Sequence, residues 1–425
     1  MTSELSYNEA YVWIWLPGKT DPVVAGRVER LRNGRLVFNY GRSYLARNDA
    51  ISIYEPELPL QPGETRPRAN MQMPSCIRDV SPDAWGRRVI INRAMGLKAR
   101  EADTIDLDEL TYLMESGSDR IGALDFQASA TEYVARARQN ATLDELIQSA
   151  ERVEKGVPLS PDLDLALQHG TSLGGARPKA LIEDGDRKLI AKFSASGDLY
   201  NVVKAEFVAM RLAREVGLNA ANVALTRGLG KDVLLIERFD RSRVEEGWAR
   251  HAMVSALTIL ELDENEARYA SYEDLATSIR HRFTGPTRTL EELFGRIVFN
   301  ILSGNTDDHA RNHAAFWNGR MLSLTPAYDI CPQGRTGGEA SQAMLITGNK
   351  RLSQLTVCLE AAAHFLLSAE RARAIIEAQL AVIDAQWSAV CDEAGLTEVD
   401  RQFLWGRQFL NPFALEGWPA DRPLV

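Results

Sequence analysis

The chain has 425 residues, of which 45% are hydrophobic and 25% are charged, a composition typical of globular proteins. One hydrophobic core rarely serves so long a chain, so we expect two or three packing units. The net charge of -9 argues against a protein that grips nucleic acid through its own field. The sequence has neither an apolar run of about 20 residues nor the order of a signal peptide, which predicts a cytoplasmic protein without a membrane span.

The first segment, residues 1–126, is predicted to form an α+β unit. Alternating apolar residues predict strands at 11–15, 34–40 and 50–54, and the stretch SPDAWGRRVIINRAMG at 81–96 predicts a helix. The polar stretch that follows residue 126 ends in a capping-box pattern, Thr142 with Glu145, which predicts a domain boundary and a new helix.

The cysteines do not indicate a metal centre or a disulfide framework. The chain has four, Cys76, Cys331, Cys358 and Cys391, with no C-x-x-C spacing among them. We therefore expect small buried apolar side chains at these positions.

A glycine-rich stretch, HGTSLGGARPKALI, occupies residues 169–182. Gly174 and Gly175 permit backbone conformations that let successive N–H groups approach an anion, and Arg177 and Lys179 add positive charge. The stretch matches neither G-x-G-x-x-G nor G-x-x-x-x-G-K-[ST], so an ordinary glycine turn between strands is the alternative.

A predicted strand, RKLIAKFS at 187–194, follows this loop. Alternation places Leu189, Ala191 and Phe193 on one face and Lys192 on the other. A strand lysine after a glycine loop is where kinases hold the nucleotide phosphates. The alternative is an edge-strand lysine that discourages aggregation.

Two further segments follow this strand, up to residue 241. In the predicted helix NVVKAEFVAMRLAREVG, residues 201–217, Glu206 has two interpretations: an ion pair with Lys192, or an exposed helix glutamate, which the sequence favours. The apolar stretch KDVLLIERFDR, residues 231–241, ends in charges and resembles a hinge between two lobes. From about residue 250 onward the pattern predicts helices.

The stretch GNTDDHARN follows an apolar helix and concentrates polar groups. Asp307 and Asn312 have the spacing D-x-x-x-x-N of the kinase catalytic loop, in which the aspartate accepts the substrate proton and the asparagine holds Mg²⁺. Asp329 follows where a kinase needs its second metal-binding carboxylate. The alternatives are a chance match, a helix cap or a surface turn. We predict that His309 packs against the loop and that His313 is structural, because Mg²⁺ prefers oxygen ligands.

Six segments occur in a characteristic order over nearly the whole chain: SPDAWGRRVI, DRIGAL, SLGGARPKALI, ERFDR, GNTDDHARN and AYDI. Together they resemble the HipA family of bacterial serine/threonine kinases, the toxins of type II toxin-antitoxin modules. The resemblance implies an α+β, bilobal, protein-kinase-like fold with an extra N-terminal subdomain and an all-helical C-lobe. The implied domains are the N-terminal subdomain (1–126), the kinase N-lobe (142–241) and the C-lobe (242–425), with ATP and Mg²⁺ as cofactors.

The resemblance also implies roles for single residues. Asp307 matches the catalytic base, Asn312 and Asp329 match the metal-binding pair, and Ser172 matches a loop serine that relatives autophosphorylate to switch themselves off. The implied nucleotide-binding residues are Ser172, Gly174, Gly175, Lys179, Lys192, Glu237, Phe239 and Asn312, of which Glu237 and Phe239 match the adenine-contacting hinge. Relatives often have AQEK or AQPK where this chain has ARPK, so Arg177 adds a charge beside the phosphates.

Partners follow from the resemblance as well. It implies a HipB-like helix-turn-helix antitoxin, operator DNA bound through that antitoxin, and a protein substrate such as an aminoacyl-tRNA synthetase, whose phosphorylation arrests growth and promotes persistence. Two alternatives stay open. One is a low-activity, nucleotide-binding corepressor scaffold with a DNA-binding antitoxin, and the other is a small-molecule kinase, since a D-x-x-x-x-N loop does not identify its acceptor.

Overall fold

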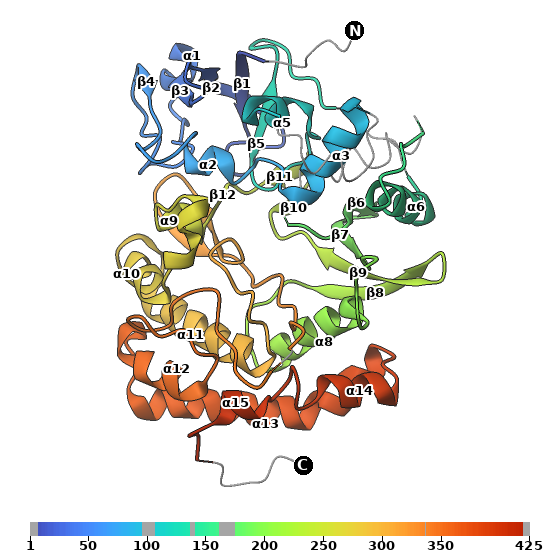
Figure 1. Cartoon of the computed structure of the whole chain (residues 1–425). Helices are drawn as coiled ribbons and strands as arrows, with labels where there is room; N and C mark the ends of the chain where they lie inside the picture. Colours follow the sequence, from blue (N-terminus) through green and yellow to red (C-terminus); the bar gives the residue numbers. More distant parts are fainter. Residues whose placement is uncertain (1–6, 96–106, 137–140, 161–174, 336, 420–425) are drawn as a thin grey trace. The chain divides into compact units, whose positions relative to one another are not determined.

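The computed structural model describes residues 7–95, 107–136, 141–160, 175–335 and 337–419 and is shown in Figure 1. Contacts between residues divide the chain into two compact units. Unit 1 contains residues 1–197, 226–254 and 316–320, and unit 2 contains residues 198–225, 255–315 and 321–425. The three-domain division by sequence stays a prediction.

Unit 1 begins with a five-stranded antiparallel sheet in the order β4-β3-β2-β1-β5. Two of its strands confirm the predictions at 11–15 and 34–40. The five strands are β1 (Glu9–Ile14), β2 (Val23–Arg30), β3 (Leu36–Tyr40), β4 (Glu64–Thr65) and β5 (Leu124–Gln127).

The prediction of a strand at 50–54 is wrong. Side chains, rather than a neighbouring strand, take up the backbone groups of this segment: Ile53 donates its N–H to the Tyr40 hydroxyl at 2.8 Å, and the Ser52 carbonyl accepts from the Trp317 indole at 2.9 Å. Alternation in sequence does not distinguish a ladder of strands from an extended segment that is fixed by tyrosine and tryptophan.

Five helices are found in the described part of unit 1, and the capping box predicted at Thr142 and Glu145 is present at the start of α6. The helices are α1 (Arg42–Leu45), α2 (Ser75–Arg78), α3 (Ala84–Met95), α5 (Glu109–Glu115) and α6 (Leu143–Glu154). Apolar residues of α3 and α6 pack with strand residues such as Ala191, Phe193 and Val233 into one core cluster.

A second sheet has the order β6-β7-β9-β8, followed by the two-stranded hairpin β10-β11. Its strands are β6 (Lys179–Asp184), β7 (Arg187–Phe193), β8 (Val223–Gly228) and β9 (Lys231–Glu237), and the hairpin comprises β10 (Arg241–Val244) and β11 (Gly247–Arg250). The strand predicted at 187–194 is therefore confirmed as β7. Because β7 lies between β6 and β9, Lys192 is not an edge-strand lysine, and that alternative is wrong.

Three buried charged side chains of unit 1, Arg238, Asp240 and Arg241, form a cluster with the partly buried Asp119. Asp119 contacts Arg238 at 3.1 Å and Arg241 at 2.8 Å, and Asp240 contacts the same two arginines at 2.8 and 2.9 Å. Burial acts to raise the pKa of Asp240, but the two positive charges outweigh it and lower that pKa to about 2. The stabilisation from Asp240 is therefore complete above its unfolded pKa of about 3.9 and is lost as the pH falls toward 2.

Unit 2 is mostly helical. The prediction of helices from residue 250 onward is confirmed apart from three short strands in the described chain, two of which include residues assigned to unit 1. The helices of unit 2 are α8 (Val202–Glu215), α9 (Ala256–Ile259), α10 (Tyr272–Arg282), α11 (Pro286–Leu302), α12 (Leu355–Ala361), α13 (Ala369–Glu393), α14 (Glu398–Leu404) and α15 (Pro412–Leu415), with 3-10 helices η1 (Glu264–Tyr269) and η2 (Ala362–Phe365). The strands β12 (Met253–Ser255), β13 (Ala314–Trp317) and β14 (Leu322–Leu324) form a small sheet.

Helix α8 packs against α13, and both appear in the lower half of Figure 1. Glu206 in α8 is only 2% exposed, so the sequence preference for an exposed glutamate is wrong. Helix α11 is buried along most of its length and packs against α10, α12, α13 and η2.

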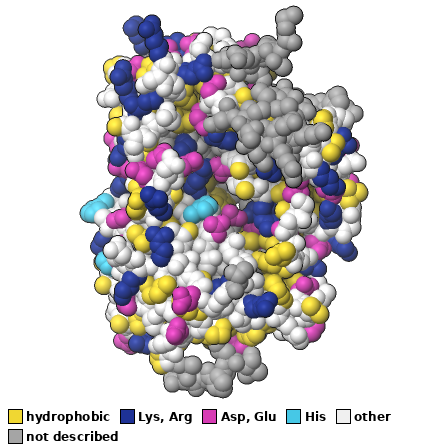
Figure 2. Space-filling view, viewed as in Figure 1, with side chains coloured by type: hydrophobic (Ala, Val, Ile, Leu, Met, Phe, Trp, Pro, Cys, Tyr) yellow, Lys and Arg dark blue, Asp and Glu magenta, His cyan; other side chains and the backbone are white. Residues whose placement is uncertain are grey.

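The remaining observations concern the charged surface, membrane-spanning helices and the cysteines. Figure 2 shows Lys and Arg side chains interspersed with Asp and Glu side chains on the face in view. Among the described residues, no helix is both long enough and apolar enough to cross a membrane. All four cysteines are buried free thiols, as expected from their spacing.

Replacing Asp240 with alanine should lower the free energy of unfolding by about 3 to 5 kcal/mol, because Arg238 and Arg241 would stay buried with one carboxylate fewer. Urea denaturation of the full chain measures the loss. Asp186 is the control, since its side chain is 86% exposed, and Asp186→Ala should change the free energy by less than about 0.5 kcal/mol. Similar losses in both variants would contradict the role of the cluster.

Candidate active site

The loop between α11 and β13 contains the predicted catalytic residues. It begins at Gly304, whose φ of +69° lies in the left-handed region, and a Cβ there would lie 2.6 Å from the Gln408 carbonyl oxygen. Glycine is therefore required by both conformation and space. The loop that follows contains backbone hydrogen bonds from His309 to Asp307 and from Asn312 to His309, both at 2.8 Å.

Asp308 anchors this loop inside unit 2. Its Oδ2 accepts hydrogen bonds from Asn300 Nδ2 at 2.7 Å, from His313 Nε2 at 2.9 Å and from the Tyr272 hydroxyl. Burial acts to raise the pKa of Asp308, but His313 and the Tyr272 hydroxyl favour the carboxylate and hold that pKa below its usual value. Asp308 is 2% exposed, so the surface-turn alternative does not hold for this residue, and the structural role predicted for His313 is confirmed.

Asp307, the adjacent residue, is exposed. Partial burial of its carboxylate raises the pKa of Asp307, His309 opposes this effect, and the negative charge of Asp329 adds to it. Asp307 and Asp329 are therefore electrostatic neighbours within unit 2. Asn312 donates from Nδ2 to the Asp307 carbonyl at 3.2 Å, so its side chain folds back over the same loop.

Asp329 follows β14 in a strained conformation. Its φ of +58° is uncommon for an aspartate. The neighbouring residues fix it: Ala327 forms a bridge with Ala220, and the Tyr328 hydroxyl donates to the Arg311 carbonyl at 2.7 Å. A backbone that is held in a sparsely populated region is a feature of functional sites.

The donor set of this loop suits a hard divalent cation. Asn312 uses its amide nitrogen in a hydrogen bond, which leaves the amide oxygen as a ligand, and Asp329 adds a carboxylate. Mg²⁺ prefers oxygen ligands and completes its shell with water and substrate phosphates rather than with an all-protein cage. Accordingly, no group of three or more His, Cys, Asp and Glu residues in the described chain would hold a metal ion by itself.

In unit 1, the end of the glycine-rich loop is held by helix α3. Gly175 donates its N–H to Asp83 Oδ2 at 2.6 Å, its carbonyl accepts from the Trp85 N–H at 3.3 Å, and the Trp85 indole donates to the Lys179 carbonyl at 3.0 Å. Sequence analysis missed this link, although Asp83 and Trp85 lie in the motif SPDAW. Ser172 and Gly174 lie outside the described residues.

Lys179 and Lys192 are directly opposite each other on the paired strands β6 and β7. Their side chains are 6% and 8% exposed. Two lysines side by side on one sheet face concentrate positive charge where like charges would normally be avoided. Glu237 ends β9, and the ring of Phe239 contacts Phe316 with the centroids 6.0 Å apart.

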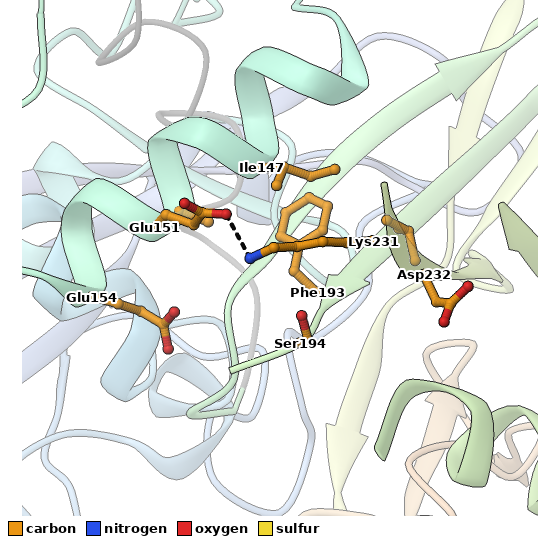
Figure 3. Close-up of a pocket in the computed structure, with 9 residues that line it drawn as sticks. Ile147, Glu151, Glu154, Phe193, Ser194, Lys231 and Asp232 are labelled. Carbon is orange, nitrogen blue, oxygen red and sulfur yellow. Dashed lines mark ion pairs between the residues drawn. The ribbon is translucent and has the colours of Figure 1, made fainter. Parts of the chain in front are cut away.

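Figure 3 shows a separate hollow of unit 1, between α6 and the strands β7 and β9. Lys231 extends across it and pairs with Glu151 at 2.6 Å, and Phe193 forms part of its floor. The predicted nucleotide-binding residues are not among the residues that line this hollow, so we do not assign it to the active site.

Comparison with known proteins shows which family models and which relatives this chain matches. The model of the HipA N-terminal domain matches residues 14–127, and that of the HipA-like C-terminal domain matches residues 171–387. The Y4mE protein of Sinorhizobium fredii is 25% identical over 346 residues, which cover 75% of this chain and 76% of that protein. The Shewanella oneidensis protein named serine/threonine-protein kinase toxin HipA is 26% identical over 183 residues, 37% of this chain and 42% of that protein.

A solved structure has the same fold. It is the Shewanella oneidensis MR-1 complex of HipA, HipB and its operator DNA, one chain of which aligns with a TM-score of 0.67 and 17% identity. The alignment covers 95% of this chain and 99% of that chain. The expected α+β class with a helical C-terminal region is confirmed.

Substitution of Asp308 should lower the stability of the folded chain strongly, whereas substitution of Asp307 should leave it almost unchanged. Asp308→Ala removes one acceptor from three buried donors, and each unsatisfied donor costs about 1 to 3 kcal/mol, so we expect a loss of at least about 3 kcal/mol in urea denaturation. Asp308→Asn should lose less, because its amide oxygen can still accept. Asp307→Ala should leave stability within about 0.5 kcal/mol, as exposed positions do. Equal stability of the two alanine variants would refute the anchoring role.

Proposed function

The chain belongs to the HipA family of kinases, and from this membership we propose that it is an ATP-dependent serine/threonine protein kinase, the toxin of a HipBA-like toxin-antitoxin system. The observation that carries the proposal is the loop of unit 2, where the buried Asp308 anchors a turn that exposes Asp307 and folds Asn312 back over it. A rigidly supported, accessible carboxylate is what phosphate transfer to a protein hydroxyl requires.

Asp307 is the proposed base. It accepts the proton of the acceptor hydroxyl as the oxygen bonds to the γ-phosphorus of ATP and the bond to the ADP oxygen breaks, and the proton then passes to solvent. Exposure of Asp307 lets a folded protein reach it. Asn312 and Asp329 are the proposed ligands of Mg²⁺, which when bound neutralises charge on the phosphate oxygens.

Unit 1 supplies the proposed nucleotide-binding residues. The opposed lysines Lys179 and Lys192 bind phosphate oxygens. Gly175 leaves room for the Lys179 ammonium, since a Cβ at position 175 would lie 2.5 Å from Lys179 Nζ. Ser172 and Gly174 belong to the same loop by sequence, and the proposed adenine contacts are Glu237 and Phe239.

The proposed partners rest on the resemblance to HipA, which was solved with HipB and operator DNA. A helix-turn-helix antitoxin would supply positive charge for DNA, which fits the net charge of -9 of this chain. The proposed substrate is a translation-related protein of the cytoplasm, such as an aminoacyl-tRNA synthetase, whose modification arrests growth and leads to persistence.

Two variants test the chemistry. Asp307→Asn should still bind ATP yet lose about 10²- to 10⁴-fold in transfer rate, the usual contribution of a catalytic base, and should no longer arrest growth. Asp329→Ala should abolish transfer and weaken Mg²⁺-dependent ATP binding. Incubation with radiolabelled ATP, alone and with cell lysate, measures transfer, and labelled protein distinguishes this function from that of a small-molecule kinase.

Unchanged autophosphorylation in Asp329→Ala would overturn the metal assignment. Growth arrest that persists in Asp307→Asn, without transfer, would replace the kinase proposal with the corepressor scaffold.

Autophosphorylation is the proposed means of self-limitation. A phosphate on Ser172 adds a charge of about -1.5 to -2 to a loop that otherwise faces nucleotide phosphates, so it should inactivate the enzyme. Mass spectrometry of the wild type after incubation with ATP and Mg²⁺ should find phosphate on Ser172, and Asp307→Asn should show none. A wild-type loop that stays unmodified while other proteins are phosphorylated would reject the self-limiting switch. In that case Ser172 merely caps the turn through its hydroxyl.

A further inference from the structure

Arg335 in unit 2 is a partly buried residue whose guanidinium nitrogens have no partner among the described residues. Its Nε, Nη1 and Nη2 atoms are all shielded from solvent, and none has a hydrogen-bond partner among the residues that the structure describes. Other buried arginines are paired with carboxylates, such as Arg296 with Glu292 at 2.9 Å and Arg238 with Asp240 at 2.8 Å. An unpaired buried guanidinium destabilises the folded state, so its presence calls for an anion from outside the described chain.

The position of Arg335 connects this anion to the catalytic loop. The segment that leads from Asp329 to Arg335 is fixed by two hydrogen bonds: Gln333 donates its N–H to the Gly304 carbonyl at 3.0 Å, and the Tyr200 hydroxyl donates to the Pro332 carbonyl at 2.6 Å. Gly304 is the residue at which the catalytic loop begins. Arg335 is two residues beyond Gln333, a span of at most about 7 Å of backbone.

Resting on the kinase function proposed above, we propose that Arg335 binds a phosphate group that takes part in the reaction. The planar guanidinium presents a fork of donors that matches two phosphate oxygens at once. The phosphate has two sources with the same chemistry: the terminal phosphate of ATP, or the phosphate that has just been transferred to the acceptor. In both cases the fixed positive charge stabilises the negative charge of the transferred group.

Thermal unfolding of the full chain tests the anion site without reference to catalysis. Arg335→Met should raise the Tm of the ligand-free chain, because an apolar side chain of similar length replaces an uncompensated cation. Inorganic phosphate should raise the Tm of the wild type and leave that of Arg335→Met unchanged, because only the wild type binds it. Arg288→Ala, which removes an exposed arginine from α11 of the same unit, should behave like the wild type. A less stable Arg335→Met variant with a full phosphate response would overturn the proposal.

Calorimetric titration with ATP, ADP and O-phosphoserine distinguishes the two sources. If Arg335 binds the terminal phosphate, Arg335→Met weakens ATP binding by about 10- to 100-fold, as expected for one charge-assisted contact, and leaves ADP binding unchanged. If Arg335 binds the transferred phosphate, only O-phosphoserine binding weakens. Unchanged affinity for all three ligands would reject the site. A wild type that binds phosphate through Arg335 but transfers none would reject the kinase function and leave the anion site standing.

Discussion

One ionic cluster ties distant segments of unit 1 together, and it consists of the buried Arg238, Asp240 and Arg241 and the partly buried Asp119. Asp119 and Asp240 each contact both Arg238 and Arg241, and Asp119 is 122 positions away from Arg241 in the sequence. The cluster therefore joins the segment that leads into β5 with the end of β9. A buried charge is tolerated only when its partners are in place, so the cluster connects the N-terminal sheet with the end of β9, where the proposed hinge residue Glu237 lies.

The requirement that a buried charge be paired or hydrogen-bonded also separates the roles of two neighbouring aspartates in unit 2. Asp308 is buried and accepts three hydrogen bonds from residues of α10, α11 and the end of its own loop. Asp307 is exposed as a residue, and partial burial of its carboxylate, with a smaller contribution from the negative charge of Asp329, raises its pKa. A loop whose buried residue is fully bonded can hold its exposed residue in a defined place, and a catalytic base needs this precision.

Buried positive charge marks the places where phosphate is proposed to bind. Lys179 and Lys192 are directly opposite each other on β6 and β7 in unit 1, and the guanidinium nitrogens of Arg335 are buried without a partner among the described residues of unit 2. The unpaired guanidinium of Arg335 departs from the pairing of buried arginines such as Arg238 and Arg296. Departures of this kind are expected at functional sites, where a ligand supplies the missing interaction.

Local patterns were sufficient for some features and misleading for others. The capping box at Thr142, the strand bearing Lys192 and the order of the catalytic motifs depend on residues close together in sequence, so the sequence predicted them. The segment 50–54 alternates like a strand but is fixed by the Tyr40 hydroxyl and the Trp317 indole, and the latter is 265 positions away from Ser52. No local pattern contains such a partner.

The sequence by itself determined the family, the class of fold and the candidate chemistry of Asp307, Asn312 and Asp329, because a motif keeps its residue types and spacing whatever surrounds it. Only the tertiary structure decided that Asp308 is the buried anchor and Asp307 the exposed group, since the two are chemically identical and adjacent. Their difference comes from Tyr272, Asn300 and His313, which contribute hydrogen bonds from other parts of unit 2. Burial and pairing are properties of the folded chain, and they arise only when distant segments are brought together.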